Sequence, residues 1–449
     1  MEPLEKLYRR HVREIFLHSL AAVDPTELAA GSLRLIDELL RVGEKEYNLS
    51  QYDSIYVIGV GKASAKMAFA LEQVLGQRIK EGLVLTPYQT QMELKRIEIH
   101  IGGHPIPNEA GMKGTQKMVS LLKKLTKRDL VFALISGGGS AMLTLPASPV
   151  TLEDKRQLTR LMLECGANID EINTLRKHLS QSKGGQLAKY ASPAALVSLI
   201  LSDVVGDRLD SIASGPTVPD DTTFADCLDI IEKYRLRDKV PHRVLQYLQM
   251  GLEERVGETP KRGDPIFENC YHVVIGNNRL ALRAAAAKAE ELGYRPFILS
   301  SSIEGEAREV ARFHSAIVKE ILNTSNPISA PACLISGGET TVTVKGSGIG
   351  GRNLEFVLQL ALEIDELLQV TVLSAGTDGI DGNSDAAGAL ADGETISRAT
   401  DFGLNPRSFL DNNDSYTFFR KLGDLIITGP TETNVLDVRI IAIGEENCK

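Results

Sequence analysis

Three glycines in a row, between two serines, form the stretch of the chain whose residue types most favour a chemical role. The string LISGGGSAML places Gly137, Gly138 and Gly139 after a short apolar segment, between Ser136 and Ser140. Glycines leave backbone N–H groups unshielded, and successive N–H groups bind anions. A turn that merely ends a strand rarely needs three glycines, so we expect these five residues to bind a phosphate.

A lysine follows another glycine turn, in the string VIGVGKASAKMA. Gly59 and Gly61 allow a tight turn, and Lys62 precedes the expected start of a helix, where free N–H groups and the helix dipole already favour an anion. The string is not a Walker A loop, because the four-residue spacer is missing, and Ser64 replaces the third glycine of a dinucleotide fingerprint. Two interpretations stay open: an anion site that includes Gly61 and Lys62, or a strand-to-helix turn with a solvated lysine.

The second half of the chain repeats LISGG at residues 334–338 and adds a glycine-rich turn after it. In VKGSGIGGRNLEF, an arginine, Arg352, directly follows the last glycine at the entrance of a strong helix pattern. An arginine there suits the charge that develops on a transferring phosphoryl group. We expect Arg352 to be catalytic and its neighbours to bind nucleotide or substrate; these neighbours are Gly338, Glu339, Gly350, Gly351 and Asn353.

Two carboxylates come shortly after apolar strands. Asp203 ends the string LVSLILSD, and Asp378 follows VTVLSAGT. A carboxylate at the carboxyl end of a strand is well placed to bind Mg²⁺, and Asp203 could also accept a hydroxyl proton. Helix capping at Asp203 and turn formation at Asp378 are the structural alternatives. We therefore name both as metal candidates and Asp203 also as a catalytic candidate.

Cations gather in the string INTLRKHLSQSKGGQLA, which we expect to form one helix. Arg176, Ser180 and Lys183 would share a face at spacing i, i+4 and i+7. A carboxylate or phosphate could bind to Arg176 and Lys183 on that face, although a solvated charged face is the alternative. His178 has no partner that the sequence identifies, so we give it no role.

The elements that must position these residues alternate between strands and helices, which predicts an α/β fold with largely parallel sheets. In such sheets, ligands bind where strands end and loops lead into helices. The expected strands lie at 54–60, 81–86, 130–136, 196–202, 271–276, 294–300, 331–336, 341–346, 370–376 and 437–444. The clearest expected helices lie at 63–76, 279–293 and 352–368.

A length of 449 residues predicts more than one domain. Residues 236–269 are polar and rich in turn residues, so we expect them to form a connection. We therefore predict an N-terminal Rossmann-like α/β domain at 1–255 and a C-terminal α/β domain at 265–449. Each would be an α/β/α sandwich, with the active site in a cleft between them.

Composition excludes several classes of protein. The formal charge of −9 argues against nucleic acid as a partner, since phosphate backbones need clustered cations. Five scattered cysteines without a CxxC pair predict a reduced protein with no disulfide framework. The N-terminus lacks the apolar core of a signal peptide, and the longest apolar stretch is too short to cross a membrane. We expect a cytoplasmic protein with no membrane partner, either a monomer or a homodimer.

The motifs also resemble a known family. In order along the chain, they are VIGVGKAS, GGHPIPNEAG, LISGGGSAML, INTLRKHLSQSKGGQLA, LSDVVGDRLDSIASGPT, GGETTVTVKGSGIGGRN, AGTDGIDGNSDAAGA and TGPTETNV. They are similar to the motifs of the glycerate 2-kinases, the type II glycerate kinases whose C-terminal part is the MOFRL domain, here about residues 331–443. Two positions depart from the family pattern: Glu432 stands where glycine is usual, and Leu354 where glutamine is common.

The resemblance implies transfer of the γ-phosphoryl group of ATP to the 2-hydroxyl of D-glycerate, with Mg²⁺, giving 2-phosphoglycerate and ADP. It also implies that Lys62 and Arg352 are required for activity. We expect both to neutralise the γ-phosphoryl oxygens, while backbone N–H groups at 137–139 and 348–351 hold phosphates and the segment around Arg176 holds the glycerate carboxylate.

Two other functions remain as alternatives. A hydroxypyruvate reductase would need a nicotinamide site, and the incomplete fingerprint around Gly59 argues against one. A protein that binds a nucleotide or metabolite without turnover is the second alternative, and the presence of both Lys62 and Arg352 disfavours it. Oxidation of NAD(P)H with hydroxypyruvate would indicate the first, and ATP binding without ADP production would indicate the second.

Overall fold

The computed structural model describes residues 4–90 and 92–445, and the chain divides into two compact units. The N-terminal unit contains residues 25–275. The C-terminal unit contains the residues up to Asp24 and those from Gly276 onward. Both units are α/β structures built on a six-stranded sheet, which confirms the predicted fold class.

The sheet of the N-terminal unit has the strand order β6-β5-β4-β7-β8-β9. The pairs β4/β5, β4/β7, β5/β6 and β7/β8 are all parallel. Residues of β4 and β7 are almost all buried, as expected for a parallel sheet covered on both faces. The strands are β4 (Ser54–Val60), β5 (Ile79–Thr86), β6 (Ile97–Ile101), β7 (Asp129–Ile135), β8 (Ala195–Leu201) and β9 (Cys270–Gly276).

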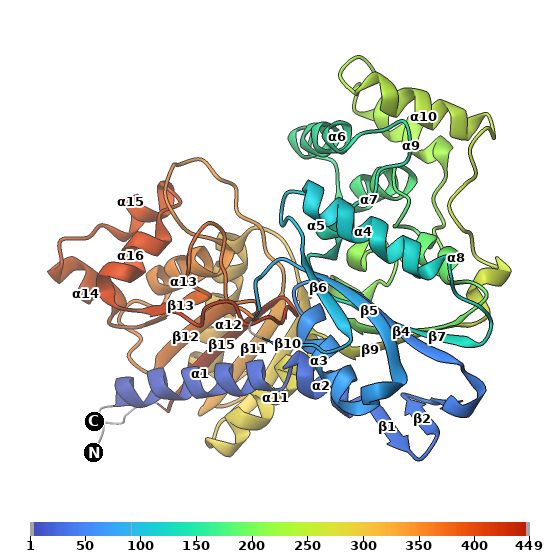
Figure 1. Ribbon diagram of the computed structural model, residues 1–449. Helices are drawn as coiled ribbons and strands as arrows, with labels where there is room; N and C mark the ends of the chain where they lie inside the picture. Colours follow the sequence, from blue (N-terminus) through green and yellow to red (C-terminus); the bar gives the residue numbers. More distant parts are fainter. Residues whose placement is uncertain (1–3, 91, 446–449) are drawn as a thin grey trace. The chain divides into compact units, whose positions relative to one another are not determined.

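Helices cover this sheet on both faces (Figure 1). On one face, α4 (Glu109–Leu122) and α8 (Gln186–Ala191) pack on the strands, with Ile58, Leu85 and Met118 among the residues of the shared core. On the other face lie α3 (Ser64–Leu75) and α2 (Pro25–Gly31). A small antiparallel sheet accompanies them, consisting of β1 (Leu33–Ile36), β2 (Leu39–Val42) and β3 (Lys45–Asn48).

Four helices of the N-terminal unit form a separate group with its own apolar core. They are α6 (Leu152–Glu164), α7 (Ile169–His178), α9 (Phe224–Lys233) and α10 (His242–Leu252). Capping boxes begin three of them, at Thr151, Asn168 and Thr223, because each side chain satisfies a free N–H group of the first turn. The group includes α10, so the segment expected as a plain connection contains a packed helix.

One helix prediction in this group is wrong. The cationic string was expected to form a single helix, but α7 ends at His178, and α8 begins only at Gln186. Gly184 and Gly185 both have positive φ between them, which breaks the helical path. Ser180 and Lys183 therefore do not share a helix face with Arg176.

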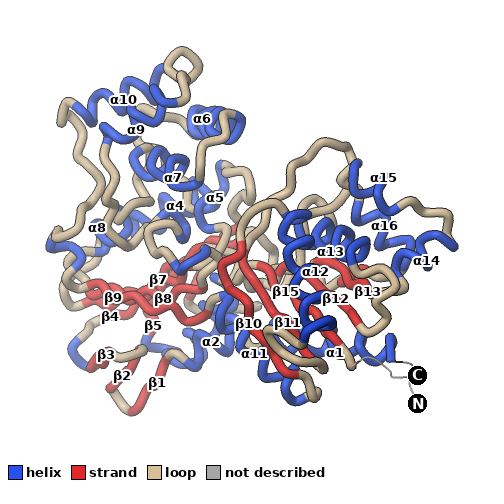
Figure 2. The backbone as a smooth tube through the Cα atoms, turned by 180° about the vertical axis from the view of Figure 1, so that it is seen from behind, coloured by secondary structure: helices blue, strands red, loops and turns tan. Residues whose placement is uncertain are grey.

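The C-terminal unit has a mixed sheet with the order β10-β11-β15-β12-β13-β14, seen as red strands in Figure 2. Only β10 and β11 pair in parallel among its described pairings, and β15 lies antiparallel to both β11 and β12. The expectation of largely parallel sheets thus fits the N-terminal unit better. The strands are β10 (Arg295–Ile303), β11 (Ala332–Gly338), β12 (Val370–Gly376), β13 (Gly388–Asp392), β14 (Leu425–Ile426) and β15 (Asp437–Ile443).

Residues 341–346, expected as a strand, form none. Thr341 makes an isolated bridge to Glu306, and the N–H groups of Lys345 and Gly346 donate to the side chain of Asn413. The alternation of threonine and valine in this segment is typical of a strand, but its backbone donors face side chains instead of a neighbouring strand.

Helices cover both faces of the mixed sheet. On one face α1 (Leu4–Ala21) packs against α11 (Asn278–Glu291) and contacts β12 and β15. On the other lie α12 (Ala307–Thr324) and α13 (Arg352–Glu363), with α14 (Thr395–Asp401), α15 (Pro406–Asp411) and α16 (Ser415–Leu422) beside them. Because α1 belongs to this unit, and because β9 completes the other sheet, the observed units differ from the predicted division at 1–255 and 265–449.

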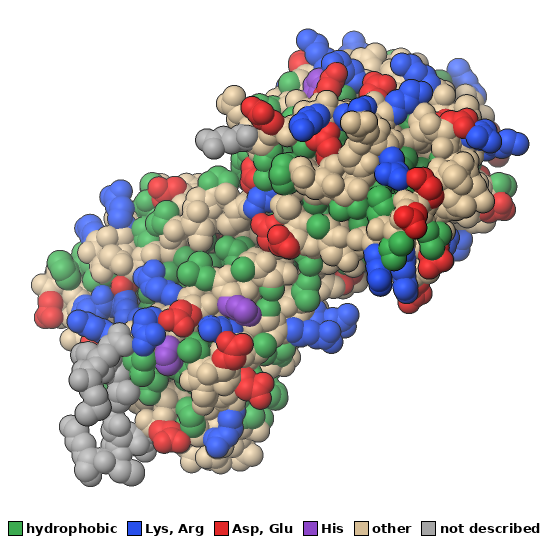
Figure 3. All heavy atoms as spheres, turned by 60° about the horizontal axis from the view of Figure 1, so that its bottom comes forward, with side chains coloured by type: hydrophobic (Ala, Val, Ile, Leu, Met, Phe, Trp, Pro, Cys, Tyr) green, Lys and Arg blue, Asp and Glu red, His purple; other side chains and the backbone are tan. Residues whose placement is uncertain are grey.

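The surface carries charges of both signs. Figure 3 shows acidic and basic side chains intermixed over the face that it presents. Among the described residues, no helix has the length and apolar character needed to span a membrane.

Buried His314 on α12 generates a prediction about pH. Its Nδ1 lies 2.7 Å from Val310 O and its Nε2 lies 2.9 Å from the hydroxyl of Ser336, in the second LISGG string. Burial, assisted by the charge of Arg439, lowers the pKa of His314 to about 4. Between about pH 4 and pH 6.5, His314 therefore binds a proton in the unfolded chain but not in the folded chain. The contribution of neutral His314 to the free energy of unfolding is complete above about pH 6.5 and is lost as the pH falls toward 4.

We expect His314 to stay neutral at pH 5 and to account for ~2 kcal/mol of the stability lost between pH 7 and pH 5. Imidazole NMR of the native protein would report the charge directly. Denaturant unfolding of His314→Gln should show a smaller loss over the same range, while His242→Gln, at an exposed position, should match the wild type. A His314 resonance that titrates near pH 6.5 would contradict the account.

Candidate active site

In the N-terminal unit, the turns after β4 and β7 are locked together. Gly61 has φ +125°, and a Cβ at this position would lie 2.1 Å from Ser136 Oγ. Lys62 N donates to Gly137 O at 2.8 Å, and Ala63 N donates to Ser136 Oγ at 3.0 Å. The two turns predicted to bind an anion therefore lie at the same edge of the sheet, and the backbone of Lys62 lies directly beside the glycine loop.

The glycine loop leads into a short helix, α5 (Gly139–Met142), and other segments converge on it. The hydroxyls of Ser140 and Ser214 lie 2.8 Å apart, and Ser214 donates to Asn173 Oδ1. Lys183 Nζ donates to Ser140 O at 2.7 Å. Lys183 thus contacts the loop. It does so from the segment between α7 and α8, not from the helix face that the sequence predicted.

Sequence reasoning missed three residues of this cluster. Asn173 and Ser214 were not singled out, although both lie inside quoted motifs. The ring of His104 also lies against the loop, since a Cβ at Gly138 would stand 3.0 Å from His104 Cδ2. The string GGHPIPNEAG was the signal that could have pointed to His104.

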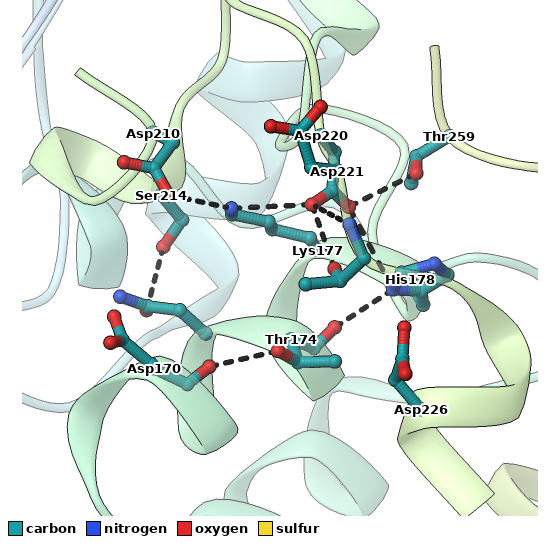
Figure 4. Close-up of polar contacts among 12 residues, drawn as sticks. Asp170, Thr174, Lys177, His178, Asp210, Ser214, Asp220, Asp221, Asp226 and Thr259 are labelled. Carbon is teal, nitrogen blue, oxygen red and sulfur yellow. Dashed lines mark hydrogen bonds and ion pairs between the residues drawn. The ribbon is translucent and has the colours of Figure 1, made fainter. Parts of the chain in front are cut away.

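A polar network connects the end of α7 to neighbouring segments of the N-terminal unit (Figure 4). The ammonium of Lys177 lies between Asp220, at 3.3 Å, and Asp210, at 3.7 Å. His178 Nδ1 donates to Thr174 O at 2.9 Å, and its Nε2 lies 2.8 Å from Glu258. Burial alone would raise the pKa of Glu258, but the contact with His178 outweighs it and lowers the pKa to about 2. His178 thus has partners in the fold, Thr174 and Glu258, that the sequence did not identify.

Three other cations of this region have no carboxylate partner within the described chain. Lys155, Arg176 and Lys183 make no ion pair there, and Lys155 Nζ is buried without any hydrogen bond. Burial lowers the pKa of each, to about 7 for Lys155, and the mutual repulsion of neighbouring cations adds to the shifts of Lys155 and Lys183. Such a concentration of unpaired positive charge favours binding of an anion.

In the C-terminal unit, Arg352 begins α13 and is held by Asp437. Arg352 Nε and Nη2 lie 2.8 and 3.0 Å from the two oxygens of Asp437, which is fully buried. Burial alone would lower the pKa of Arg352, but Asp437 outweighs it and raises the pKa above its ordinary value. The third nitrogen, Nη1, pairs with the half-exposed Glu339 at 2.9 Å.

The mixed topology explains why Asp437 reaches this edge. Because β15 runs antiparallel to its neighbours, its first residue aligns with the last residues of β11 and β12, Gly338 and Gly376. Sequence reasoning searched only where strands end, so it missed a carboxylate at the start of a strand. Arg439, fully buried two residues later, also donates to Asp437 and packs over the ring of Phe356.

Asp381 fixes the first turn of α13. It accepts from Asn353 N at 3.1 Å and from Leu354 N at 2.9 Å, and Asn353 Nδ2 reaches both Asp381 and Asp437. Asn353 is thus a supporting residue in this structure, with its side chain directed to two buried carboxylates. Burial is the largest influence on Asp381 and raises its pKa to about 6.

The prediction that N–H groups at 348–351 are open to phosphate fails for most of this loop. Gly348 N donates to Asn412 O, Ile349 N to Asp414 Oδ1 and Gly350 N to Asn383 Oδ1. The loop is therefore anchored by its own protein acceptors; Gly348 and Gly350 lie close to residues 412–415, and Gly351 lies close to Asp381. Its part in the site is to carry Arg352.

The two metal candidates lie in different units, Asp203 after β8 and Asp378 after β12. Asp378 Oδ1 accepts from Ile380 N at 3.2 Å, which is the turn-forming alternative. No group of three or more acidic, histidine or cysteine side chains in the described residues could hold a metal ion. A cage made of protein ligands alone is therefore absent from the described part of the chain.

Comparison with known proteins places this geometry in a family. Residues 11–249 match the model of a domain of unknown function, DUF4147, and residues 332–437 match the MOFRL family. The D-glycerate 2-kinase of Thermotoga maritima is 44% identical over 86% of this chain and 90% of its own length. The chain belongs to the glycerate 2-kinase family.

Two further comparisons are informative. A glycerate kinase of known structure from Thermotoga maritima has a TM-score of 0.85 and 40% identity, covering 98% of this chain and all of its own. A protein of Agrobacterium vitis named a putative hydroxypyruvate reductase is 44% identical over 86% of this chain and 87% of its own length. The second name matches one of the alternatives that the sequence left open.

The structure accounts for both departures from the family pattern. Glu432 has φ +59°, in the left-handed region that favours glycine, so its backbone keeps the conformation of the residue that is usual there. Leu354 is fully buried in the core beneath α13.

The close approach of Gly61 to Ser136 generates a prediction. Gly61→Ala should separate the two turns, because the new Cβ overlaps Ser136 and the positive φ is strained, and should cost ~3 kcal/mol of unfolding free energy. Gly206→Ala is the matched control, since Gly206 also has positive φ, +78°, in the left-handed region, but open space around it. It should cost ~1 kcal/mol. Equal losses for the two variants in denaturant unfolding would contradict the account.

Proposed function

We propose that this protein transfers the γ-phosphoryl group of ATP to the 2-hydroxyl of D-glycerate, giving 2-phosphoglycerate and ADP. Membership of the family supports the reaction class. The observation that carries the proposal is the position of two cations: the backbone of Lys62 is hydrogen-bonded to the glycine loop, and the guanidinium of Arg352 at the start of α13 is held by Asp437. Preorganised positive charge of this kind stabilises a phosphoryl transition state.

Residues of the N-terminal unit would bind the anionic parts of the reactants. N–H groups of Gly137 and Gly138 make no hydrogen bond with the described chain and can donate to a phosphate. Lys62, at the start of the neighbouring turn, would neutralise a γ-phosphoryl oxygen. Arg176 and Lys183 would hold the carboxylate of D-glycerate, since neither has a carboxylate of the protein as partner.

Arg352 would act through the nitrogen that now contacts Glu339. Asp437 occupies the other two nitrogens and fixes the plane of the guanidinium. Glu339 is half-exposed, so a phosphoryl oxygen can replace its carboxylate at little cost, because exposed ion pairs contribute little. In this proposal the nucleotide displaces Glu339 from Arg352, so Glu339 does not itself bind the nucleotide.

Magnesium fits this site as an ion carried mainly by phosphates. Mg²⁺ usually keeps several waters and takes one or two carboxylates together with substrate phosphates. Asp203, after β8 in the unit that holds the glycine loop, would supply such a carboxylate. When bound, the ion would offset charge on the phosphates. Asp378 is the weaker candidate because it already accepts a turn N–H.

The alternatives find less support. Ser64 fills the place of the third fingerprint glycine, and its hydroxyl donates to both Gly61 O and Leu85 O, so it belongs to the turn itself. A nicotinamide dinucleotide usually needs a glycine there for close helix–strand packing. A binding protein without turnover would not require Arg352 to be held in one orientation. Cytoplasmic location and the monomeric or homodimeric state remain predictions.

The direct test is an assay of the purified protein with ATP, Mg²⁺ and D-glycerate, followed by ³¹P NMR of the product. We expect ADP and 2-phosphoglycerate in equal amounts. Phosphate on the 3-hydroxyl would overturn the proposed regiochemistry, and NADH oxidation with hydroxypyruvate in the absence of ADP formation would favour the reductase.

The clamp on Arg352 generates a separate prediction. Asp437→Asn should lower kcat by ~10-fold or more, since a freed guanidinium loses its preorganisation, but should have no further effect in an Arg352→Ala background. Asp392→Asn is the matched control. Asp392 is equally buried and pairs with Arg9, but it aligns with Thr371 at the opposite end of β12.

Steady-state kinetics of these variants would check the prediction, with thermal unfolding to confirm that each folds. If Asp437→Asn lowers kcat as much without Arg352 as with it, Asp437 acts on something other than Arg352. If Asp392→Asn lowers kcat equally, the loss reflects the sheet as a whole.

A further inference from the structure

Lys155 is a buried cation to which neither the sequence nor the proposed reaction assigned a role. It lies on α6 with 8% of its surface exposed, and its ammonium has no hydrogen-bond partner. Leu158 and Leu175 line the same small pocket. A buried charge normally has a partner or becomes neutral, because leaving water is costly for an ion. A bound anion would supply the missing partner and keep the ammonium charged.

Two other cations share this environment. Arg176 lines the same pocket as Lys155, and the charges of both act on Lys183, which is itself almost completely buried. None of the three pairs with a carboxylate of the described chain. Lys177, one residue after Arg176, makes the contrast plain: it has both Asp210 and Asp220 (Figure 4). Lys177 on α7 thus has carboxylate partners from the protein, whereas Lys155, Arg176 and Lys183 have none in the described chain.

The pocket beside Lys155 is small and matches an anionic oxygen. It holds about 10 Å³, roughly the room that one water-sized group needs. Thr159 adds a hydroxyl to its lining. Lys183 extends the group toward the glycine loop through its hydrogen bond to Ser140 O. Lys183 therefore lies beside the segment proposed to bind phosphate, and the group of cations can hold a second anionic group near it.

We propose that Lys155, Arg176 and Lys183 form one oxyanion site that binds the carboxylate of the acid substrate, with Lys155 supplying the innermost positive charge. This inference rests on the proposed function and extends it, because it makes Lys155 a determinant of the requirement for an acid. A substrate of the same size without the negative charge would leave three cations unpaired and would bind poorly.

D-Glyceramide provides the probe, since its carboxamide has nearly the size of the carboxylate but no charge. The wild-type enzyme should prefer D-glycerate over D-glyceramide by ~100-fold in kcat/KM, the scale of lost charge-assisted hydrogen bonds. In Lys155→Met that preference should shrink ~10-fold, mainly through a higher KM for D-glycerate, with KM for ATP unchanged. Arg160→Met, which removes an exposed cation from the same helix, should keep the wild-type preference.

A stability measurement separates binding from a structural role. Lys155→Met replaces an unpaired buried ammonium by an apolar side chain of similar length, so its melting temperature without ligand should equal or exceed that of the wild type. A residue kept for packing would show the opposite. Lys155→Gln serves as a second variant if the methionine variant does not fold.

Three results would overturn the inference. An unchanged preference in Lys155→Met, or a wild-type enzyme that accepts D-glyceramide as readily as D-glycerate, would show that Lys155 does not recognise a carboxylate. A raised KM for ATP with the acid preference intact would assign the cations to nucleotide phosphates. These outcomes differ from failure of the proposed function, in which the wild-type protein would phosphorylate neither compound.

Discussion

The contact of Gly61 with Ser136 is the constraint on which the candidate site of the N-terminal unit depends. With no side chain at Gly61, the turn after β4 rests directly on the turn after β7, and the N–H groups of Lys62 and Ala63 are used to hold them together. The backbone of Lys62 and the glycine loop are thereby fixed to each other before any ligand arrives. Charges held in advance need no reorganisation during reaction, which is the main source of electrostatic catalysis.

In the C-terminal unit, Arg352 at the start of α13 is held in place by different contacts. In its glycine loop, the N–H groups of residues 347–350 donate to Asn383, Asn412 and Asp414, and these bonds hold the loop at the start of α13. Two buried carboxylates, Asp381 and Asp437, then secure the first turn and its arginine. One unit thus offers backbone donors and a lysine, and the other offers a single arginine held by an ion pair.

The LISGG string, which occurs twice, shows that an identical local sequence can adopt two different structures. At residues 334–338 the whole string lies within β11, paired on both sides, and Gly338 has φ +116° where Ile303 approaches it. At residues 134–138 the strand ends at Ile135, and the rest forms the loop before α5. The neighbouring strands decide the outcome, since β15 extends the pairing of β11 to its last residue.

Local pattern predicted most strands and the longer helices, because apolar runs and helical periodicity depend on nearby residues. The strands at 54–60 and 370–376 agree with β4 and β12 to the residue. Features set by distant residues could not be predicted in this way: the antiparallel insertion of β15, the return of α1 to the C-terminal unit, and the end of α7 at His178. The same limit explains the missed site residues, since Asp437 and Lys155 acquire their importance from partners, or from the lack of partners, that only the folded chain reveals.

The central claim is that Lys62 and Arg352 act on the phosphoryl group as it transfers. Rapid-quench measurement of a single turnover with Lys62→Ala and with Arg352→Ala tests it most directly, because product release does not enter. The account predicts that each substitution slows the chemical step by ~10²–10³-fold while ATP still binds, as for the loss of one preorganised charge. A chemical step of near-normal rate in both variants would contradict it.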